Sequence, residues 1–160
     1  MDFNRESITQ SAEETAKFGE SLANTLSRQS SVVSRQQGSK GRGATVICLY
    51  GDLGSGKTTF AQGFAKGLGI PSRLLSPTFI IVRRYEMPQS EGFLYHLDLY
   101  RVGGEKNLEG LGISEILTDS DSYVLIEWAE KLEGLLPDRR IDIRFSLNKG
   151  GRHSIVVKNF

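Results

Sequence analysis

Residues 44–60 read ATVICLYGDLGSGKTTF, and the expected fold follows from this stretch. The run from Ala44 to Tyr50 is continuously apolar, which is typical of a strand covered on both of its faces. The segment that follows, Gly51 to Thr58, matches the pattern G-x-x-x-x-G-K-[ST], in which a glycine-rich loop leads into a helix. Strand, loop and helix in this order predict an α/β sheet, with the helix starting near Gly56 and ending at Gly69.

The loop has the chemistry of a phosphate-binding site. Its glycines let backbone N–H groups and the positive end of the helix approach phosphate oxygens that side chains would block. Lys57 is expected to reach the β- and γ-phosphates, and Thr58 to offer its hydroxyl to Mg²⁺. The alternative is a strand-to-helix turn that holds no ligand. The predicted phosphate-binding residues are Asp52, Leu53, Gly54, Ser55, Gly56, Lys57 and Thr58.

The nucleotide base leaves a weaker signal. A guanine-specific site would present Asn-Lys-x-Asp, and the nearest stretch, Asn148 to Gly151, lacks the aspartate. This absence favours ATP over GTP. We therefore expect ATP and Mg²⁺ to be the cofactors.

Length and composition restrict the other possibilities. With 160 residues, 38% of them hydrophobic, the chain is expected to form one domain, 1–160, around one core. Its 20 Lys and Arg against 19 Asp and Glu give no general attraction to polyanions. The only cysteine, Cys48, cannot form an internal disulfide and favours a reducing compartment. Because no segment resembles a leader or reaches transmembrane length, we expect a soluble, cytoplasmic protein.

The remaining chain alternates helix-like and strand-like patterns. Ser11 to Glu14 has capping-box spacing, and the apolar residues that follow predict a helix from about Ala12 to Leu26. The next stretch, Ser27 to Gly43, is rich in serine, glutamine and glycine without any acid, so it is interpreted as a flexible insertion. A basic arm that contacts RNA is the alternative there. Helical or irregular structure is expected at 108–117, strands at 78–85, 93–100 and 123–128, and an antiparallel hairpin at 141–147 and 154–158.

Two acids are placed to complete a phosphate site. A phosphate loop needs an acidic partner for Mg²⁺, usually at the carboxyl end of a neighbouring parallel strand. Glu127 ends an apolar run and is predicted to ligate Mg²⁺ directly or through water. Asp98 is predicted to orient the attacking water or to hold a mobile loop. A salt bridge with Arg101 or a turn cap is the structural alternative for Asp98.

Four further features of the sequence bear on the site. Ser76-Pro77-Thr78 follows the first helix at a distance from which its hydroxyls can sense a γ-phosphate, although a plain proline turn explains the pattern equally well. His96 and His153 have no partner at metal-ligand spacing and are expected to be structural. Trp128 is expected in the core, with stacking on a ligand as the alternative.

Four segments together resemble the TsaE family, also called YjeE. They are Gly51 to Thr59, Ser76-Pro77-Thr78-Phe79, His96 to Arg101 and Ile126-Glu127-Trp128. Members of this family are small bacterial P-loop ATPases required to make threonylcarbamoyladenosine in tRNA, at the adenosine beside the anticodon. The resemblance implies a three-layer P-loop NTPase fold, with a mostly parallel central sheet and a C-terminal antiparallel hairpin.

The resemblance also implies roles for individual residues. Thr58 and Glu127 match the Mg²⁺ positions, Asp98 and Trp128 match positions important for activity, and Thr59 matches a second hydroxyl of the loop. The region around the base corresponds to Thr15, Gly151 and Arg152. Ser55 and Phe79 stand where alanine and tyrosine are commoner in the family, and both changes are mild. The residues expected to act in catalysis are Lys57, Thr78, Asp98 and Glu127.

The family further implies the partners. TsaD transfers the threonylcarbamoyl group and is paired with TsaB, while TsaC makes the threonylcarbamoyl-adenylate that TsaD uses. ATP hydrolysis would reset the TsaB–TsaD complex between turnovers, so this chain would meet tRNA only through that complex and would not bind a membrane.

Two other functions stay open on the sequence. A small-molecule kinase shares the loop and needs an arginine-bearing lid, for which Arg83-Arg84 and Arg139-Arg140 are candidates. A nucleotide-gated binding module would use ATP only to select a conformation.

Overall fold

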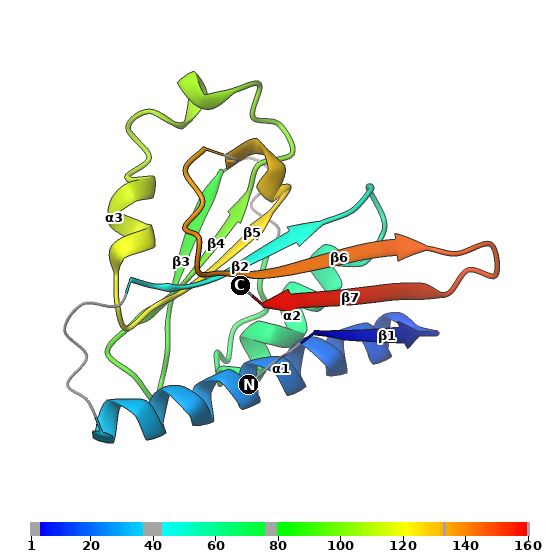
Figure 1. Cartoon of the computed structure of the whole chain (residues 1–160), viewed down its shortest axis with the longest axis horizontal. Helices are drawn as coiled ribbons and strands as arrows, with labels where there is room; N and C mark the ends of the chain where they lie inside the picture. Colours follow the sequence, from blue (N-terminus) through cyan, green and yellow to red (C-terminus); the bar gives the residue numbers. More distant parts are fainter. Residues whose placement is uncertain (1–3, 37–42, 76–79, 133, 160) are drawn as a thin grey trace.

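The computed structural model describes residues 4–36, 43–75, 80–132 and 134–159. Seven strands and three α-helices account for most of them (Figure 1). The elements in chain order are β1 (Arg5–Thr9), α1 (Ala12–Gln36), β2 (Thr45–Tyr50), α2 (Lys57–Gly67), β3 (Val82–Glu86), β4 (Phe93–Asp98), the 3₁₀ turn η1 (Glu105–Leu108), α3 (Ile113–Thr118), β5 (Tyr123–Glu127), the 3₁₀ turn η2 (Ala129–Leu132), β6 (Ile141–Leu147) and β7 (His153–Asn159).

The strands form one mixed sheet in the order β1-β7-β6-β2-β5-β4-β3. The central strands β6, β2, β5 and β4 run parallel, while β3, β7 and β1 are antiparallel to their neighbours. This arrangement confirms the predicted parallel centre and the antiparallel hairpin of β6 and β7. Because β2 lies between β5 and β6, the loop that follows it opens at the carboxyl edge of the parallel strands.

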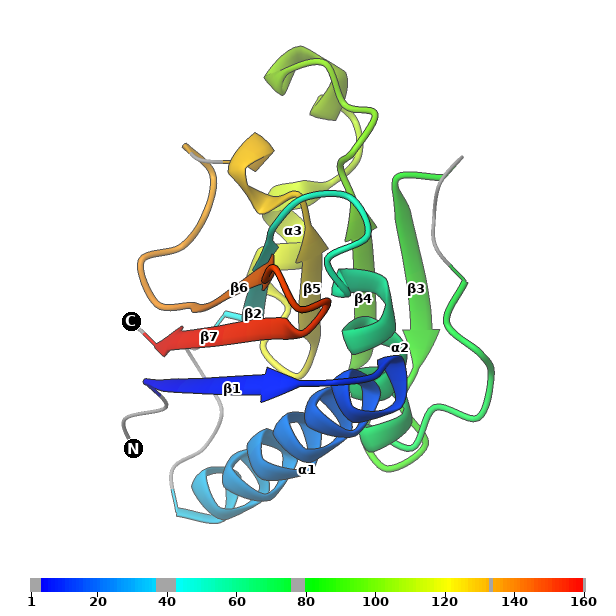
Figure 2. The same cartoon turned by 90° about the vertical axis from the view of Figure 1, so that its right-hand side faces the viewer.

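Helices cover both faces of the sheet, which gives three layers (Figure 2). Along β2, Ile47 and Leu49 point into the core beneath α1 and α2, whereas Val46 and Cys48 point into the core beneath α3 and η2. Every side chain of this strand interior is therefore buried, as its continuous apolar pattern predicts.

Helices α1 and α2 pack closely through glycines. A Cβ atom at Gly63 would lie 1.9 Å from the carbonyl oxygen of Ala16, and one at Gly19 would lie 2.3 Å from the carbonyl oxygen of Phe60. Neither position has room for a side chain. This contact places the first turn of α1 beside the first turn of α2, where the phosphate loop ends.

The start of α1 follows the predicted capping pattern. The Ser11 hydroxyl accepts a hydrogen bond from the Glu14 N–H at 3.1 Å, and the Glu14 carboxylate accepts one from the Gln10 N–H at 2.7 Å. The predicted end at Leu26 is wrong, because α1 continues to Gln36. Serine, arginine and glutamine are tolerated in a helix, and no glycine or proline follows until Gly38.

Strands β3 and β4 differ from the prediction by more than one residue. Strand β3 begins at Val82 instead of residue 78, and residues 76–79 lie outside the described structure. Strand β4 ends at Asp98 instead of Tyr100, because the Asp98 carboxylate accepts a hydrogen bond from the Tyr100 N–H at 3.0 Å and closes a turn. Strand β1 was not predicted. In the described part of the chain, no helix combines the length and the apolar character needed to cross a membrane.

Candidate phosphate and metal site

The loop between β2 and α2 has the backbone conformation that its glycines were expected to permit. Gly54 and Gly56 have φ angles of 77° and 107°, which favour glycine because a side chain would be strained there. Helix α2 starts directly at Lys57, and no described side chain caps its first turn. The first N–H groups of α2 are therefore available to an anion at the positive end of the helix.

The side chain of Lys57 folds back into this loop. Its ammonium group donates hydrogen bonds to the carbonyl oxygens of Gly51 and Asp52, the latter at 2.8 Å. The same nitrogen lies 4.3 Å from the centre of the Trp128 ring. Burial lowers the pKa of Lys57, and the carboxylates of Glu127, Glu130, Asp98 and Asp52 oppose that shift. Only 5% of the residue is exposed, so its ammonium group lies inside the loop rather than in solvent.

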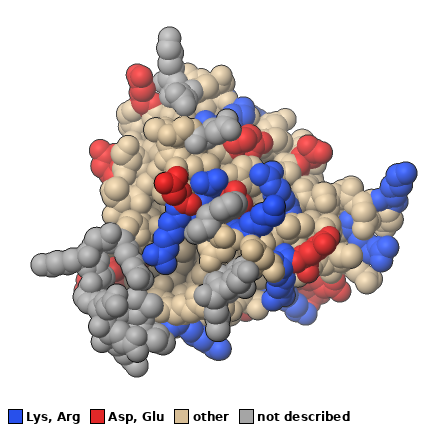
Figure 3. Space-filling model, viewed as in Figure 1, with Lys and Arg blue, Asp and Glu red and all other residues tan. Residues whose placement is uncertain are grey.

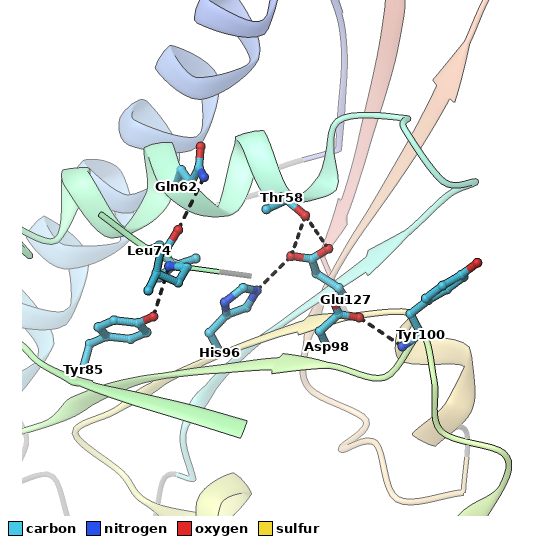
Figure 4. Close-up of polar contacts among 9 residues, drawn as sticks. Thr58, Gln62, Leu74, Tyr85, His96, Asp98, Tyr100 and Glu127 are labelled. Atoms are coloured by element: carbon cyan, nitrogen blue, oxygen red, sulfur yellow. Dashed lines mark hydrogen bonds and ion pairs between the residues drawn. The ribbon is translucent and has the colours of Figure 1, made fainter. Parts of the chain in front are cut away.

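Thr58, Glu127 and His96 form a hydrogen-bonded row at the mouth of the loop (Figure 4). The Thr58 hydroxyl donates to the Glu127 carboxylate, 2.9 Å from Oε2 and 3.2 Å from Oε1. His96 Nε2 lies 2.8 Å from Glu127 Oε1. A carboxylate accepts hydrogen bonds only, so the proton of this contact is on Nε2. Glu127 is 2% exposed and His96 is fully buried, so the contact between these two side chains is shielded from solvent.

Asp98 and Glu127 end neighbouring parallel strands and are paired in register. This pairing brings the two predicted acids to the same edge of the sheet. The turn cap foreseen as an alternative for Asp98 is present, since Oδ1 accepts the Tyr100 N–H. The Asp98 N–H also donates to the carbonyl oxygen of Ile81 at 3.1 Å. Asp98 therefore joins the site to the chain that enters β3.

Trp128 is half-buried and links the site to the second core. Its φ angle of 60° is unusual for a residue other than glycine. The indole packs against that core on one side, and it contacts the Tyr100 ring at a centroid distance of 5.1 Å. Because the Lys57 ammonium also lies over the ring, Trp128 is both a core residue and a wall of the phosphate site.

The residues predicted around the base lie in the first turn of α1 and in the turn between β6 and β7. Thr15 is buried, and its methyl group is 3.4 Å from where a Cβ atom of Gly56 would be. Gly151 and Arg152 are exposed in the turn between β6 and β7. The structure therefore brings Thr15 to the loop, and the turn is joined to the loop through His153.

The loop residues differ in exposure. Asp52, Leu53 and Gly54 are exposed, Ser55 is buried, and Thr59 is half-buried. Thr78, predicted to act in catalysis, lies outside the described residues. The chain just before it is attached to the fold, because Gln62 donates to the Leu74 carbonyl oxygen at 3.4 Å and the Leu75 N–H donates to the Tyr85 hydroxyl at 3.3 Å (Figure 4).

Sequence reasoning missed the contacts of both histidines. It looked only for partners at metal-ligand spacing, whereas His96 meets Glu127 across two strands and His153 Nδ1 lies 2.7 Å from the Ser55 carbonyl oxygen. The signal for His96 was a polar residue at a core position of an alternating strand, which demands a buried polar partner. Nothing in the local pattern pointed to the partner of His153.

The donors at this site suit Mg²⁺ bound together with phosphate. Within the ranges that the structure describes, no three His, Cys, Asp or Glu side chains form a metal-binding group. Mg²⁺ commonly uses one or two protein oxygens and takes its other ligands from water and phosphate. Neighbouring ligands of octahedral Mg²⁺ are about 2.9 Å apart when each bond is about 2.05 Å long. The Thr58 and Glu127 oxygens have this separation, 2.9 Å.

Comparison with known proteins identifies the family. The model of the family described as "Threonylcarbamoyl adenosine biosynthesis protein TsaE" matches residues 9–155. The TsaE protein of Haemophilus influenzae is 41% identical over 98 residues, 61% of this chain and 60% of that protein, so the match spans about three fifths of the relative. The TsaE protein of Treponema pallidum is 31% identical over 94% of this chain and 97% of its own length.

A solved structure agrees with this assignment. The crystal structure of Bacillus subtilis YdiB has a TM-score of 0.71 and 27% identity, covering 100% of this chain and 88% of that one. With its phosphate loop, its strand-end acids and a family model that matches most of its length, this chain belongs to the TsaE family of tRNA threonylcarbamoyladenosine biosynthesis.

Proposed function

We propose that this chain binds ATP with Mg²⁺ and hydrolyses it, and that hydrolysis supports the TsaB–TsaD complex in modifying tRNA adenosine beside the anticodon. The observation that carries the proposal is the hydrogen bond from Thr58 to Glu127. It joins the hydroxyl that follows the loop lysine to a buried strand-end carboxylate, and both oxygens suit Mg²⁺.

The phosphates of ATP would bind at the start of α2. The uncapped N–H groups of its first turn offer hydrogen bonds, and the positive end of the helix favours negative charge. Lys57 would exchange the carbonyl oxygens of Gly51 and Asp52 for phosphate oxygens, and this move keeps its ammonium group within the loop. Such contacts strengthen as negative charge develops on the transferring phosphoryl group.

Thr58 and Glu127 would hold Mg²⁺, and His96 would keep the Glu127 carboxylate in place. When bound, Mg²⁺ neutralises charge on the phosphate oxygens. Asp98, paired with Glu127 at the same sheet edge, would position the attacking water or the chain that enters β3. Thr78 keeps its proposed role in sensing the γ-phosphate.

Three considerations favour an ATPase of the modification complex over the alternatives. First, the family name concerns tRNA modification. Second, Arg84 stacks on the Phe93 ring at 4.5 Å and Arg140 donates to Asp142 at 2.9 Å, so two of the four arginines proposed for a kinase lid have other contacts. Third, positive and negative side chains are mixed on the face seen in Figure 3, which fits indirect rather than direct contact with tRNA.

The test is to measure phosphate release from ATP by the purified chain, alone and with TsaB and TsaD. We expect slow release alone and faster release with the partners. The same mixture is analysed for a phosphorylated acceptor among added nucleosides and metabolites. Transfer of the γ-phosphate to an acceptor, or no release under any condition, would refute the proposed ATPase activity.

A further inference from the structure

His153 contacts the phosphate loop from the C-terminal hairpin. It is the first residue of β7, and its Nδ1 lies 2.7 Å from the carbonyl oxygen of Ser55. A carbonyl oxygen accepts hydrogen bonds only, so Nδ1 carries the proton and donates it. The contact joins residues 98 positions apart, and its acceptor belongs to the peptide that links Ser55 to Gly56.

The orientation of this peptide sets the direction of one phosphate-binding group. In a trans peptide the C=O of one residue and the N–H of the next point in opposite directions. The described chain contains no cis peptide bond. A hydrogen bond that holds the Ser55 C=O toward His153 therefore turns the Gly56 N–H away from the hairpin. Asp52 and Gly54, which precede this peptide in the loop, are exposed.

The backbone of His153 is held in the sheet by its pairing with β1. His153 pairs with Thr9, the last residue of β1, and the Thr9 and Thr15 hydroxyls lie 2.7 Å apart. A Cβ atom added to Gly56 would be 3.4 Å from the Thr15 methyl group and 3.6 Å from His153 Nδ1. Strand β7 and helix α1 thus support the same peptide from behind.

We propose that His153 is a positioning residue, which presets the Gly56 N–H for a phosphate group of the nucleotide. The inference rests on the proposed binding of nucleotide phosphates to this loop. His153 would thereby affect the affinity for phosphate, a role that its sequence context did not predict. The hairpin of β6 and β7 would thus contribute to nucleotide binding through the backbone of the phosphate loop. It would do so by reducing the change in loop conformation that binding requires.

Two substitutions separate this role from packing. His153→Asn places an amide nitrogen near the position of Nδ1 and keeps the donor, whereas His153→Leu keeps bulk and removes it. We would measure the Kd of ADP with Mg²⁺ by calorimetry, the amide proton shift of Gly56 by NMR, and the melting temperature without nucleotide. Because one hydrogen bond contributes about 1 kcal/mol, His153→Leu should weaken ADP binding about fivefold.

The expected result is that His153→Asn binds ADP within about twofold of the wild type and keeps the ADP-induced shift of Gly56. His153→Leu should bind ADP about fivefold more weakly and show a smaller Gly56 shift at saturating ADP. Wild-type affinity in His153→Leu would overturn the inference. The inference would also be overturned if both variants bound ADP equally weakly and their melting temperatures fell in parallel, because lost packing alone would explain that result. If the wild type itself binds no ADP, the proposed nucleotide binding is refuted. That result differs from the two outcomes above, which would refute only the role of His153. Should His153→Leu not fold, His153→Met, which also has no N–H donor, replaces it.

Discussion

The Thr58 hydroxyl lies 2.9 Å from a carboxylate oxygen of Glu127, although 69 residues separate the two in the chain. Parallel pairing of β2 with β5 produces this contact, because Leu49 is in register with Glu127. The loop that follows β2 leads into α2, whose first turn lies near the carboxyl end of β5. Two segments distant in the sequence thus bring together the two oxygen atoms that we propose as Mg²⁺ ligands.

The Thr58 hydroxyl should decide the Mg²⁺ requirement. Thr58→Ala removes one proposed ligand and should raise the Mg²⁺ concentration needed for half-maximal ATP hydrolysis about tenfold or more. Thr58→Ser keeps the hydroxyl and serves as the matched control, with a requirement close to that of the wild type. A titration of hydrolysis against Mg²⁺ checks this. Equal requirements in the alanine and serine variants would remove Thr58 from the metal site.

His96 should act through Glu127. His96→Gln places an amide nitrogen near the position of Nε2 and can still donate to Glu127, whereas His96→Leu cannot. Loss of a group that orients a metal ligand typically costs 10- to 100-fold in metal affinity or activity, so we expect about that loss for His96→Leu and partial rescue by His96→Gln. The readout is the Mg²⁺ dependence of ATP hydrolysis, with the melting temperature measured beside it. If leucine leaves that dependence unchanged, His96 serves only packing.

Gly63→Ala should destabilise the protein. Alanine in an exposed helix interior normally stabilises by about 1 kcal/mol relative to glycine, but this Cβ atom would lie 1.9 Å from the Ala16 carbonyl oxygen. Because α1 and α2 must separate, we expect the free energy of unfolding to fall by about 2–3 kcal/mol in a urea titration. Lys66→Ala, on an exposed face of the same helix, is the control and should change it by less than about 1 kcal/mol. A stabilised Gly63→Ala variant would contradict the close packing.

Cys48 should be unreactive in the folded protein. Burial raises the pKa of its thiol to about 12 from an ordinary value near 9, and the charge of Asp142 adds to the shift. The unfolded chain therefore loses this proton at lower pH than the folded one. Its contribution to stability is complete below about pH 9 and is lost as pH rises towards 12. At pH 8 a thiol reagent should modify Cys48 only after unfolding in urea, and rapid reaction of the native protein would disprove this.

Local sequence was enough to predict the elements whose signals are local. The apolar run of β2, the glycines and lysine of the loop, and the hairpin of β6 and β7 each carry their own pattern, and the structure confirms all three. Glu127 was found because a strand-end acid is itself a local signal. Its contact with Thr58 then followed from parallel pairing.

The remaining features depend on tertiary contacts. Strand β1 is short, polar and held at the sheet edge by β7, so its residues show no strand periodicity. The second half of α1 has a composition that fits a loop as well as a helix, and only the absence of a breaker before Gly38 argued for its length. His96 and His153 find partners in strands and loops distant in sequence, which spacing rules cannot detect.

The most direct test of the central claim is ATP turnover in the presence of TsaB and TsaD, compared between the wild type, Lys57→Ala and Glu127→Ala. Glu115→Gln, on the exposed surface of α3, is the control for loss of a carboxylate. We expect turnover to fall at least about 100-fold in both site variants and to be unchanged in the control. Wild-type turnover in Lys57→Ala and Glu127→Ala would contradict it.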